Sequence, residues 1–306
     1  MAKRSSTKRD FLSLSDFSFR EWMWIFKRAA WYKKHRFSKA LKNKVILLLF
    51  SKPSTRTRVS FERGIYDMGG NAIYMDVSTS QMKRGETPED TARVLSRYVD
   101  AVVVRTFSQE ELERMASVAS IPFINALTDF SHPAQIASDI FTVLEIFGNF
   151  QVKVAYVGDG NNVANSLIEA SGIFPISLVV ATPEGYEPSR VMVERARSKG
   201  ANLILTHDPV EAVSGAHVIY TDVWVSMGQE GSEDKKRAFK SFQVNSELLS
   251  RAREDAVVMH CLPAHRGEEI TDEVMDGPRS VVFDQAENRL HVQKAIMEAL
   301  FVLEKS

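Results

Sequence analysis

Hydrophobic and polar positions alternate in blocks along the chain, and these blocks predict strands separated by helices. Short apolar, β-rich runs occur in two series, with intervening stretches such as 88–99 that carry apolar residues at helical spacing. This order of elements is typical of parallel sheets covered by helices. The runs of the first series are 44–50, 71–76, 101–106 and 122–127, and those of the second are 152–160, 177–183, 202–208, 217–224, 256–263 and 280–285.

The two series predict two domains. We expect an α/β protein in which each domain has a central parallel sheet flanked by helices, linked by interdomain helices. The stretch 14–34 should form an amphipathic helix before the first strand, capped by Ser15 or Asp16. The first domain is predicted at 1–135, together with a C-terminal helix at about 288–306 that packs back, and the second at 150–287.

Composition narrows the classes of partner. The 306 residues are 44% hydrophobic, which is enough for a substantial core. With 39 basic and 39 acidic side chains, no general field favours nucleic acid or a membrane surface, so any anion must be bound locally. The one cysteine, Cys261, cannot form an internal disulfide, and no apolar run approaches the length of a membrane span. We expect a cytoplasmic protein whose first ten residues form a solvated tail.

Hydroxyl and basic side chains follow the first buried run. Residues 51–58 read SKPSTRTR and stand where a strand should end and a helix begin. Ligands of open parallel sheets bind there, and a helix N-terminus offers N–H groups to an anion. Arg56 adds a planar fork that suits phosphate oxygens. A helix cap with exposed arginines is the alternative. The candidate anion-binding residues are Ser54, Thr55, Arg56 and Thr57.

Polar side chains also follow other predicted strands. Arg105 ends the run 101–106, His132 and Gln135 flank a proline turn after 122–127, and Arg289 stands near the start of the final helix. Gathered at one sheet edge with Arg56, the side chains of Arg105, His132 and Gln135 would suit a small ligand that carries phosphate and a carbonyl group. Taken singly, His132 could be a structural residue and Arg289 a surface charge.

The second series opens with a glycine turn, VGDGNN, at residues 157–162. Gly158 and Gly160 match a dinucleotide-binding fingerprint, but Val163 stands where the third glycine belongs. A nicotinamide-dependent dehydrogenase is therefore a rival interpretation that the mismatch disfavours. Asn161 and Asn162 offer polar side chains beyond the strand, or serve only as turn and cap residues.

Two later strand ends carry groups that could serve an amino-acid substrate. The stretch TDVWVSMG (221–228) places Asp222, Ser226 and Met227 in a loop that could hold an ammonium and a carboxylate. The stretch HCLP (260–263) places Cys261 beside His260, although a buried cysteine is often an inert small hydrophobe. No His, Cys or acidic residues stand at convincing metal-ligand spacing, and we expect no metal.

In this order the strings SKPSTRTR, DFSHPAQ, TDVWVSMG and HCLP resemble the motifs of the aspartate/ornithine carbamoyltransferase family over almost the whole chain. The resemblance implies that the STRTR loop binds carbamoyl phosphate and that no cofactor is needed. Gln81 falls in a loop that family members extend toward a neighbouring subunit's site, which implies a homotrimer or a multiple of trimers. The residues that the resemblance assigns to carbamoyl phosphate are Ser54, Thr55, Arg56, Thr57, Gln81, Arg105, His132, Gln135, Cys261, Leu262 and Arg289.

The second-substrate motifs distinguish branches of that family. The aspartate branch carries His-Pro-x-Pro where this chain reads HCLP, and it lacks DVWVSMG. The resemblance therefore implies L-ornithine as the acceptor, with Cys261 near the reacting amine. Acceptors such as putrescine, N-acetylornithine and N-succinylornithine stay open, as does a noncatalytic ligand-binding relative. The residues assigned to ornithine are Asn162, Asp222, Ser226 and Met227.

The implied reaction is attack of the ornithine side-chain amine on carbamoyl phosphate, giving L-citrulline and phosphate, a step of arginine biosynthesis. Because the two sets of residues fall in different predicted domains, we expect domain closure and ordered binding with carbamoyl phosphate first. The residues carried over as catalytic are Arg56, Arg105, His132, Asp222 and Cys261.

Overall fold

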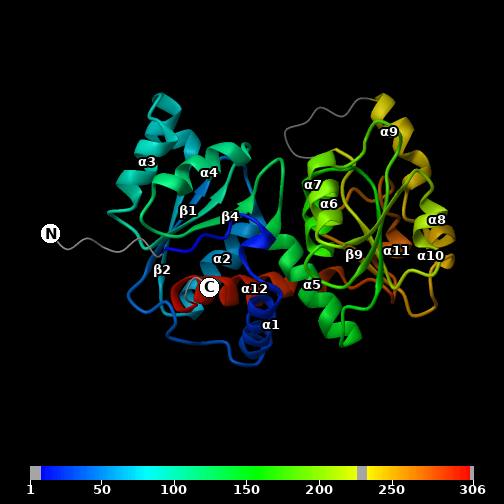
Figure 1. Ribbon diagram of the computed structural model, residues 1–306, viewed down its shortest axis with the longest axis horizontal. Coiled ribbons are helices and arrows are strands. Elements are labelled where there is room, and N and C mark those ends of the chain that lie inside the picture. Colours follow the sequence, from blue (N-terminus) through cyan, green and yellow to red (C-terminus); the bar gives the residue numbers. More distant parts are fainter. Residues whose placement is uncertain (1–7, 226–232, 304–306) are drawn as a thin grey trace. The chain divides into compact units, whose positions relative to one another are not determined.

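Two parallel sheets organise the computed structural model, which describes residues 8–225 and 233–303 (Figure 1). The chain divides between Ala137 and Ser138, and again between Asn288 and Arg289, into two compact units. The first unit contains the described residues before Ser138 and from Arg289 onward, and the second unit contains those between. The prediction of an α/β protein with two helix-flanked parallel sheets is confirmed.

The sheet of the first unit has four parallel strands in the order β2-β1-β3-β4. Leu47 and Leu49 of β1 pack into a cluster with α3 and α4, and the alternate residues Ile46 and Leu48 are buried on the opposite face. Burial of both faces explains the nearly continuous apolar runs. Figure 1 shows α3 and α4 on one side of this sheet and α1 and α2 on the other. The bounds are α1 (Phe19–Lys34), β1 (Val45–Phe50), α2 (Thr55–Asp67), β2 (Asn71–Asp76), α3 (Pro88–Leu95), β3 (Ala101–Arg105), α4 (Gln109–Val118) and β4 (Phe123–Leu127).

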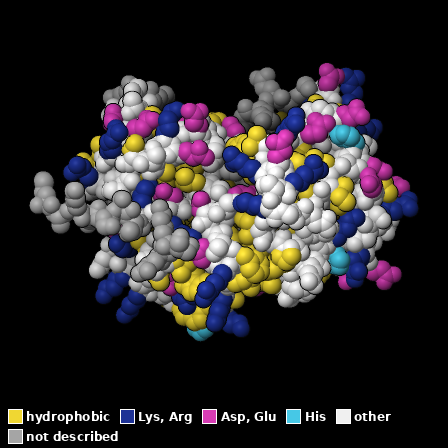
Figure 2. Space-filling view, viewed as in Figure 1, with side chains coloured by type: hydrophobic (Ala, Val, Ile, Leu, Met, Phe, Trp, Pro, Cys, Tyr) yellow, Lys and Arg dark blue, Asp and Glu magenta, His cyan; other side chains and the backbone are white. Residues whose placement is uncertain are grey.

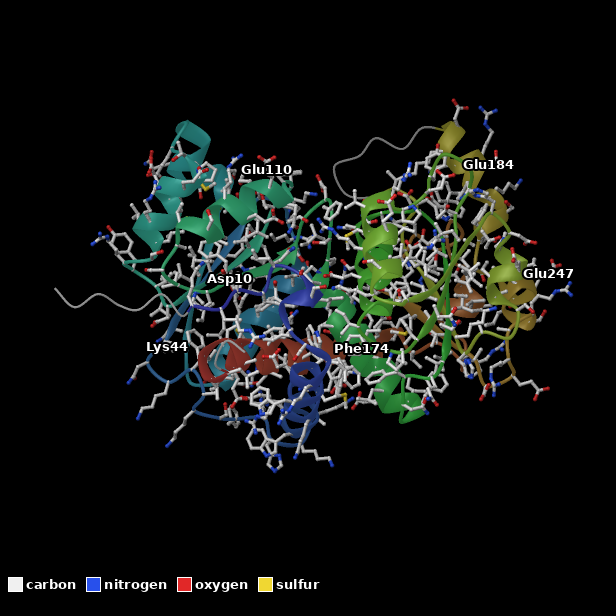
Figure 3. The ribbon with its side chains drawn as sticks, in the orientation of Figure 1. Asp10, Lys44, Glu110, Phe174, Glu184 and Glu247 are labelled. Atoms are coloured by element: carbon white, nitrogen blue, oxygen red, sulfur yellow. The ribbon has the colours of Figure 1, made fainter. Side chains whose placement is uncertain are left out.

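The sheet of the second unit has five parallel strands in the order β7-β6-β5-β8-β9. Val157, Ile219 and Val258 pack on one face with helices α8 to α11. Charged side chains such as Glu247 of α10 point outward, whereas Phe174 is buried (Figure 3). The bounds are β5 (Lys153–Val157), α6 (Asn162–Ser171), β6 (Ser177–Ala181), α7 (Arg190–Ser198), β7 (Asn202–Thr206), α8 (Pro209–Val213), β8 (Val218–Thr221), α9 (Glu233–Phe239), α10 (Ser246–Ser250), β9 (Val257–His260) and α11 (Asp272–Met275).

Two sequence predictions about local structure are wrong. Residues 280–285, predicted as a strand, make only an isolated bridge from Ser280 to Val258, and helix α12 (Val282–Val302) begins at once. The following residues are mostly good helix formers, which outweigh the short β-rich run. Helix α1 begins at Phe19 rather than directly after Ser15 or Asp16, because the cap is Ser18, whose side chain accepts a hydrogen bond from the Glu21 N–H.

Both unit boundaries fall inside helices, in α5 (Pro133–Phe147) and α12. The part of α12 beyond Asn288 packs in the first unit, where Arg28 makes two hydrogen bonds to Glu298 at 2.8 and 3.0 Å. A side chain on Gly64 would lie 3.0 Å from the Lys294 Cγ, so α2 and α12 approach closely. Within the described ranges, none of the helices has the length and apolarity needed to cross a membrane.

The strand orders determine where a ligand can bind. The chain reverses its direction across the sheet between β1 and β3 in the first unit, and between β5 and β8 in the second. Open parallel sheets bind ligands outside the carboxyl ends of strands at such switch points. Ser54 and Arg105 follow or end the strands at the first switch point, and Asn161 and Asp222 follow the strands at the second. Each unit therefore has predicted site residues at its own switch point.

Candidate active site

The loop between β1 and α2 forms a capped helix N-terminus at the first switch point. The Ser54 Oγ accepts a hydrogen bond from the Thr57 N–H at 3.3 Å, and Thr55 begins the helix with its side chain exposed. N–H groups of a first helical turn attract an anion. Arg58 does not join this site, because it pairs with Glu62 at 2.9 Å and stacks 3.7 Å from the centre of the Tyr74 ring.

A residue from the far end of the chain reaches this helix start. The Arg289 Nη2 donates to the Thr57 Oγ1 at 2.7 Å, and both side chains are buried. The two residues are 232 positions apart in the sequence. The prediction that Arg289 contacts an anion stays untested, but the structure places its guanidinium beside the STRTR loop rather than on the surface.

Positive charge surrounds His132 in the turn before α5. Burial chiefly, and then the guanidiniums of Arg289, Arg105 and Arg56, hold the pKa of His132 well below 6.5. The imidazole is therefore neutral at pH 7, where it can donate one hydrogen bond without adding charge. The structure thus brings together four of the side chains that the sequence assigns to carbamoyl phosphate.

The guanidinium cluster, which we define as Arg56, Arg105 and Arg289, is a local feature of a protein without net charge. Arg105 and Arg289 are each only 3% exposed. Over the face shown in Figure 2, basic and acidic side chains are intermingled. Charges in a partly desolvated setting act on a ligand more strongly than the same charges in water. The cluster therefore has the electrostatics of a site for a small, multiply charged anion.

Two neighbouring side chains extend this cluster. Gln135 is 1% exposed in the first turn of α5, where its N–H donates to the His132 carbonyl at 3.1 Å. Lys52 is buried in the β1–α2 loop, forms an ion pair with Asp129 and lies 4.3 Å from the centre of the Phe107 ring. Lys52 was not predicted, although it is the lysine of SKPSTRTR itself and was a usable signal.

Gln81 lies elsewhere in the first unit. It is exposed and begins a 3-10 turn, Gln81–Arg84, whose Gly85 N–H closes onto the Gln81 and Met82 carbonyls. The structure describes a single chain, so the predicted role of Gln81 toward a neighbouring subunit stays a prediction.

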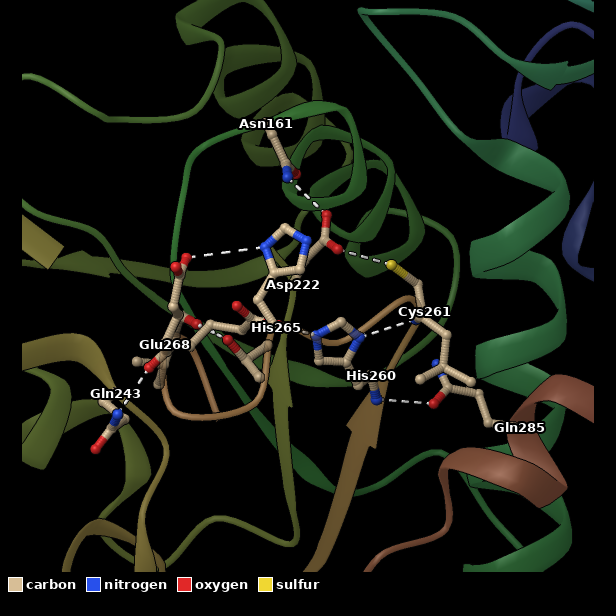
Figure 4. A network of polar contacts seen from close by, with 12 residues as sticks. Asn161, Asp222, Gln243, His260, Cys261, His265, Glu268 and Gln285 are labelled. Carbon is tan, nitrogen blue, oxygen red and sulfur yellow. Dashed lines mark hydrogen bonds and ion pairs between the residues drawn. The ribbon is translucent and has the colours of Figure 1, made fainter. Parts of the chain in front are cut away.

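Asp222 organises the second switch point. Its side chain follows β8, is 5% exposed, and accepts hydrogen bonds from the Asn161 Nδ2 at 2.7 Å and the Cys261 Sγ at 2.8 Å (Figure 4). These three residues follow three strands, β5, β8 and β9. Buried carboxylates need donors of this kind. The structure therefore brings together Asp222 and Cys261, which the sequence predicts as catalytic residues.

Asn161 is a helix cap, one of the two roles that its position after the strand predicts, and it also holds Asp222, which was not predicted. Its Oδ1 caps α6 by accepting from the N–H groups of Val163 and Ala164, while its Nδ2 holds Asp222. Asn162, the predicted ornithine ligand, is half-buried at the first position of α6. In the sequence, the two asparagines after the strand were the signal for a polar role at this position. The structure distinguishes them, because Asn161 caps α6 whereas Asn162 remains a candidate ligand. The predicted ornithine ligands Ser226 and Met227 lie outside the described residues.

The HCLP loop presents Cys261 and Leu262 from the end of β9. Both are half-buried, and Leu262 has a φ of 58°, which is unusual for a residue other than glycine. The neighbouring Tyr156 is fully buried, and burial followed by the Asp222 carboxylate raises its pKa well above 10. Its hydroxyl therefore stays protonated and donates to the Asp159 carbonyl at 2.8 Å.

The glycine turn packs against the protein's own backbone. A side chain at Gly160 would lie 2.3 Å from the Glu187 carbonyl carbon and 2.5 Å from the Tyr186 oxygen. Gly160 is therefore explained by the contact with residues 186–188, without a pyrophosphate. This geometry removes the strongest motif in favour of a dinucleotide-binding dehydrogenase.

Two groups of side chains among the described residues have ligand atoms close enough to hold a metal ion. Asp222, His260 and Cys261 form one group, and His265, Glu268 and Glu269 form the other, with atoms in each group within 4.8 Å of one another. Nitrogen, oxygen and sulfur ligands together would suit zinc. In the first group, however, Cys261 donates to Asp222 and His260 bonds to Glu269. The side chains of this group therefore already form hydrogen bonds within the protein.

Comparison with known proteins identifies the family of the chain. The model of the aspartate/ornithine carbamoyltransferase carbamoyl-phosphate-binding domain matches residues 9–145, and that of the Asp/Orn-binding domain matches 150–300. An ornithine carbamoyltransferase of Thermococcus kodakarensis is 52% identical over 299 residues, covering 94% of this chain and 95% of the relative. The chain belongs to the aspartate/ornithine carbamoyltransferase family.

Solved structures of carbamoyltransferases have the same fold. The ornithine carbamoyltransferase from Pyrococcus furiosus matches with a TM-score of 0.91 and 49% identity, covering 97% of each chain. The anabolic ornithine carbamoyltransferase from Campylobacter jejuni matches with a TM-score of 0.91 and 37% identity, covering 96% of this chain and 99% of the other. Arg289 falls within the Asp/Orn-binding match by sequence, yet it lies with the first unit in space.

Lowering the pH should destabilise this carbamoyltransferase through His132. Its folded pKa lies well below 6.5, so below that pH the unfolded chain takes up a proton that the folded chain does not. The free energy of unfolding should fall by up to about 1.4 kcal/mol per pH unit from this residue, while above pH 6.5 its effect vanishes. Urea unfolding at several pH values between 7.5 and 5.5 should show a smaller loss in His132→Asn than in the wild type. The exposed His35 provides the control, His35→Asn, which should lose as much stability as the wild type; equal losses in all three proteins would contradict the prediction.

Proposed function

We propose that the chain transfers the carbamoyl group of carbamoyl phosphate to the side-chain amine of L-ornithine, giving L-citrulline and phosphate. Family membership supports carbamoyl transfer, and the relatives cited above are named ornithine carbamoyltransferases. The observation that carries the choice of acceptor is the contact of Cys261 with Asp222. This pair lies in HCLP and DVW, the two strings that distinguish the ornithine branch from the aspartate branch.

Carbamoyl phosphate fits the electrostatics of the first unit. The start of α2 and the guanidinium cluster supply N–H groups and positive charge for the phosphate, and neutral His132 supplies a donor for the carbonyl oxygen. Negative charge grows on that oxygen and on the leaving phosphate as the reaction proceeds. Donors fixed in advance stabilise this transition state more than the ground state.

The reaction needs no covalent enzyme intermediate. The amine nitrogen of ornithine forms a bond to the carbonyl carbon, the amine loses a proton, and the carbon–oxygen bond to phosphate breaks with its electron pair leaving on phosphate. A free alkylammonium has a pKa near 10.4, so exposing its lone pair at pH 7.4 costs about 4 kcal/mol. The site must reduce this cost by favouring the neutral amine.

Asp222 and Cys261 are the groups that we propose for this task. The thiol already donates to the Asp222 carboxylate at 2.8 Å, so an amine beside the pair meets a fixed acceptor. The pair would orient the lone pair of the amine and receive its proton. Asn161 holds the other carboxylate oxygen and so limits rotation of Asp222. Asn162, together with Ser226 and Met227, remains the proposed holder of the ornithine backbone groups.

A homotrimer or a multiple of trimers is the proposed assembly, in the cytoplasm. The first unit exposes large apolar side chains on α2, on the edge strand β2 and after α3, including Val59, Tyr66, Ile73 and Tyr98, which are 46–74% exposed. An uncovered apolar edge strand is a liability for a monomer. Another copy of the chain, covering this face, would also bring a partner site toward exposed Gln81.

The first test is formation of citrulline from carbamoyl phosphate with ornithine, beside aspartate, putrescine, N-acetylornithine and N-succinylornithine at matched concentrations. We expect kcat/KM for ornithine to exceed that for each other amine by at least about 10²-fold, because charged groups left unpaired in a site are costly. Preference for another amine would keep carbamoyl transfer but overturn the acceptor. Absence of turnover with every amine would favour a noncatalytic ligand-binding relative.

Cys261→Ser should separate turnover from binding of carbamoyl phosphate. The hydroxyl keeps a donor to Asp222 but is a poorer proton carrier, so kcat for citrulline should fall by about 10²-fold or more. Titration calorimetry should show carbamoyl phosphate bound within a few-fold of the wild-type affinity, since its charged ligands lie in the first unit. Loss of that binding in a variant with normal urea unfolding would contradict the assignment.

Sedimentation equilibrium should give a mass about three times the 34.5 kDa of one chain, or a multiple of that mass. Ile73→Glu places a charge on the edge strand and should shift the protein toward a single chain. Val191→Glu, at an apolar position of the second unit that is 50% exposed, should leave the mass unchanged. A wild-type mass of one chain would refute the assembly.

A further inference from the structure

A buried imidazole–carboxylate pair lies beside the site and has no part in the steps above. His260 ends β9 and is 1% exposed, and Glu269 is 0% exposed. Their Nε2 and Oε1 atoms are 3.0 Å apart. Burying two such groups is costly unless both are hydrogen-bonded, so the pair needs an explanation beyond chance placement.

The hydrogen bonds of His260 define its tautomer. The Leu262 N–H donates to the Nδ1 at 2.8 Å, so that nitrogen must carry a lone pair. The proton therefore resides on Nε2, which donates to the Glu269 carboxylate. In this form one side of the ring accepts from the backbone of the HCLP loop and the other side is anchored by Glu269.

The same carboxylate oxygen joins both ends of the loop. The Glu269 Oε1 also accepts from the His265 N–H at 2.6 Å. Glu269 therefore connects His260, before residues 261–264, with His265, after them (Figure 4). The His260 N–H is itself held by the Gln285 Oε1 at 2.9 Å, so the base of the loop is fixed from a second direction.

Leu262 depends on this arrangement for its backbone conformation. A φ of 58° places a branched side chain in the left-handed region, which costs about 1 kcal/mol or more. The bond from its N–H to the His260 ring compensates for part of that cost. Cys261 lies between the two bonded residues, so its thiol is directed toward Asp222 by the same contact.

We infer that His260 is a positioning residue for carbamoyl transfer, and that Glu269 sets the tautomer through which it acts. The His260 ring holds the Leu262 amide, and this bond keeps Cys261 and the backbone of Leu262 in the geometry for the reacting amine and carbamoyl group. The inference rests on the proposed function. A displacement of about 1 Å in such a group can lower turnover by about 10²-fold.

Two substitutions of His260 should each remove one of the two ring hydrogen bonds and keep the other. In His260→Asn the side-chain oxygen can take the place of Nδ1 and accept from the Leu262 N–H, while the contact with Glu269 is lost. In His260→Gln the amide nitrogen can take the place of Nε2 and donate to Glu269, while the acceptor for Leu262 is lost. If holding the Leu262 amide is the function, His260→Asn should retain kcat within about 10-fold and His260→Gln should lose about 10²-fold.

Three further readouts separate positioning from general stability. Hydrogen exchange at the Leu262 amide should be faster in His260→Gln and close to wild type in His260→Asn. Calorimetry with inorganic phosphate should give affinities within about three-fold in both variants, since the proposed phosphate ligands lie in the first unit. His265→Asn, at an exposed side chain of the same loop, should match the wild type in every measurement.

Each outcome decides the inference. Equal loss of kcat in the two His260 variants, or wild-type kcat in His260→Gln, would overturn it. Loss of phosphate binding together with altered urea unfolding in both variants would show a role in folding alone and would also overturn it. A wild type that makes no citrulline, while exchange at Leu262 responds as expected, would overturn the proposed function and leave the hydrogen-bond assignment standing.

Discussion

The buried carboxylate of Asp222 is the contact on which the geometry of the second unit depends. A carboxylate that is only 5% exposed must be supplied with hydrogen-bond donors. Here the donors are Asn161 and Cys261, which follow β5 and β9, the strands on either side of β8 in the sheet. Satisfying one buried group therefore ties three strand ends into one arrangement. The Cys261 thiol is directed toward Asp222 because this buried carboxylate needs hydrogen-bond donors.

In the first unit, by contrast, the charges that act on the buried His132 are positive. There the fold concentrates guanidiniums around His132, and the imidazole stays neutral. His132 therefore adds no charge of its own, and the positive charge of this cluster favours an anionic ligand. Collecting like charges in a protein interior opposes folding. Such a concentration is understandable where an anion is bound during function, and it explains why a chain with 39 basic and 39 acidic residues can bind an anion without a basic surface.

Sequence patterns predicted the two sheets and most groups at their edges, because burial of parallel strands and the residues after them leave a local signature. The contact of Asn161 with Asp222, the pair of His260 with Glu269 and the ion pair of Lys52 were not predicted. Each depends on a partner that only the fold brings near, and the contact of Arg289 with Thr57 spans 232 positions. The error at 280–285 has a related cause, since a six-residue run does not reveal that Ser280 makes one bridge before the chain turns into α12.

The position of Arg289 also bears on the order in which the protein is made. The first unit takes Arg289 and the rest of α12 from the end of the chain, after the whole of the second unit has been translated. N-terminal domains generally fold first on the ribosome, but here α2 lacks its packing partner α12, and Thr57 lacks the guanidinium of Arg289, until the second unit has been synthesised. The first unit therefore acquires its full set of contacts only after the second unit has been made, and removal of α12 would take residues 289–302 away from the first unit.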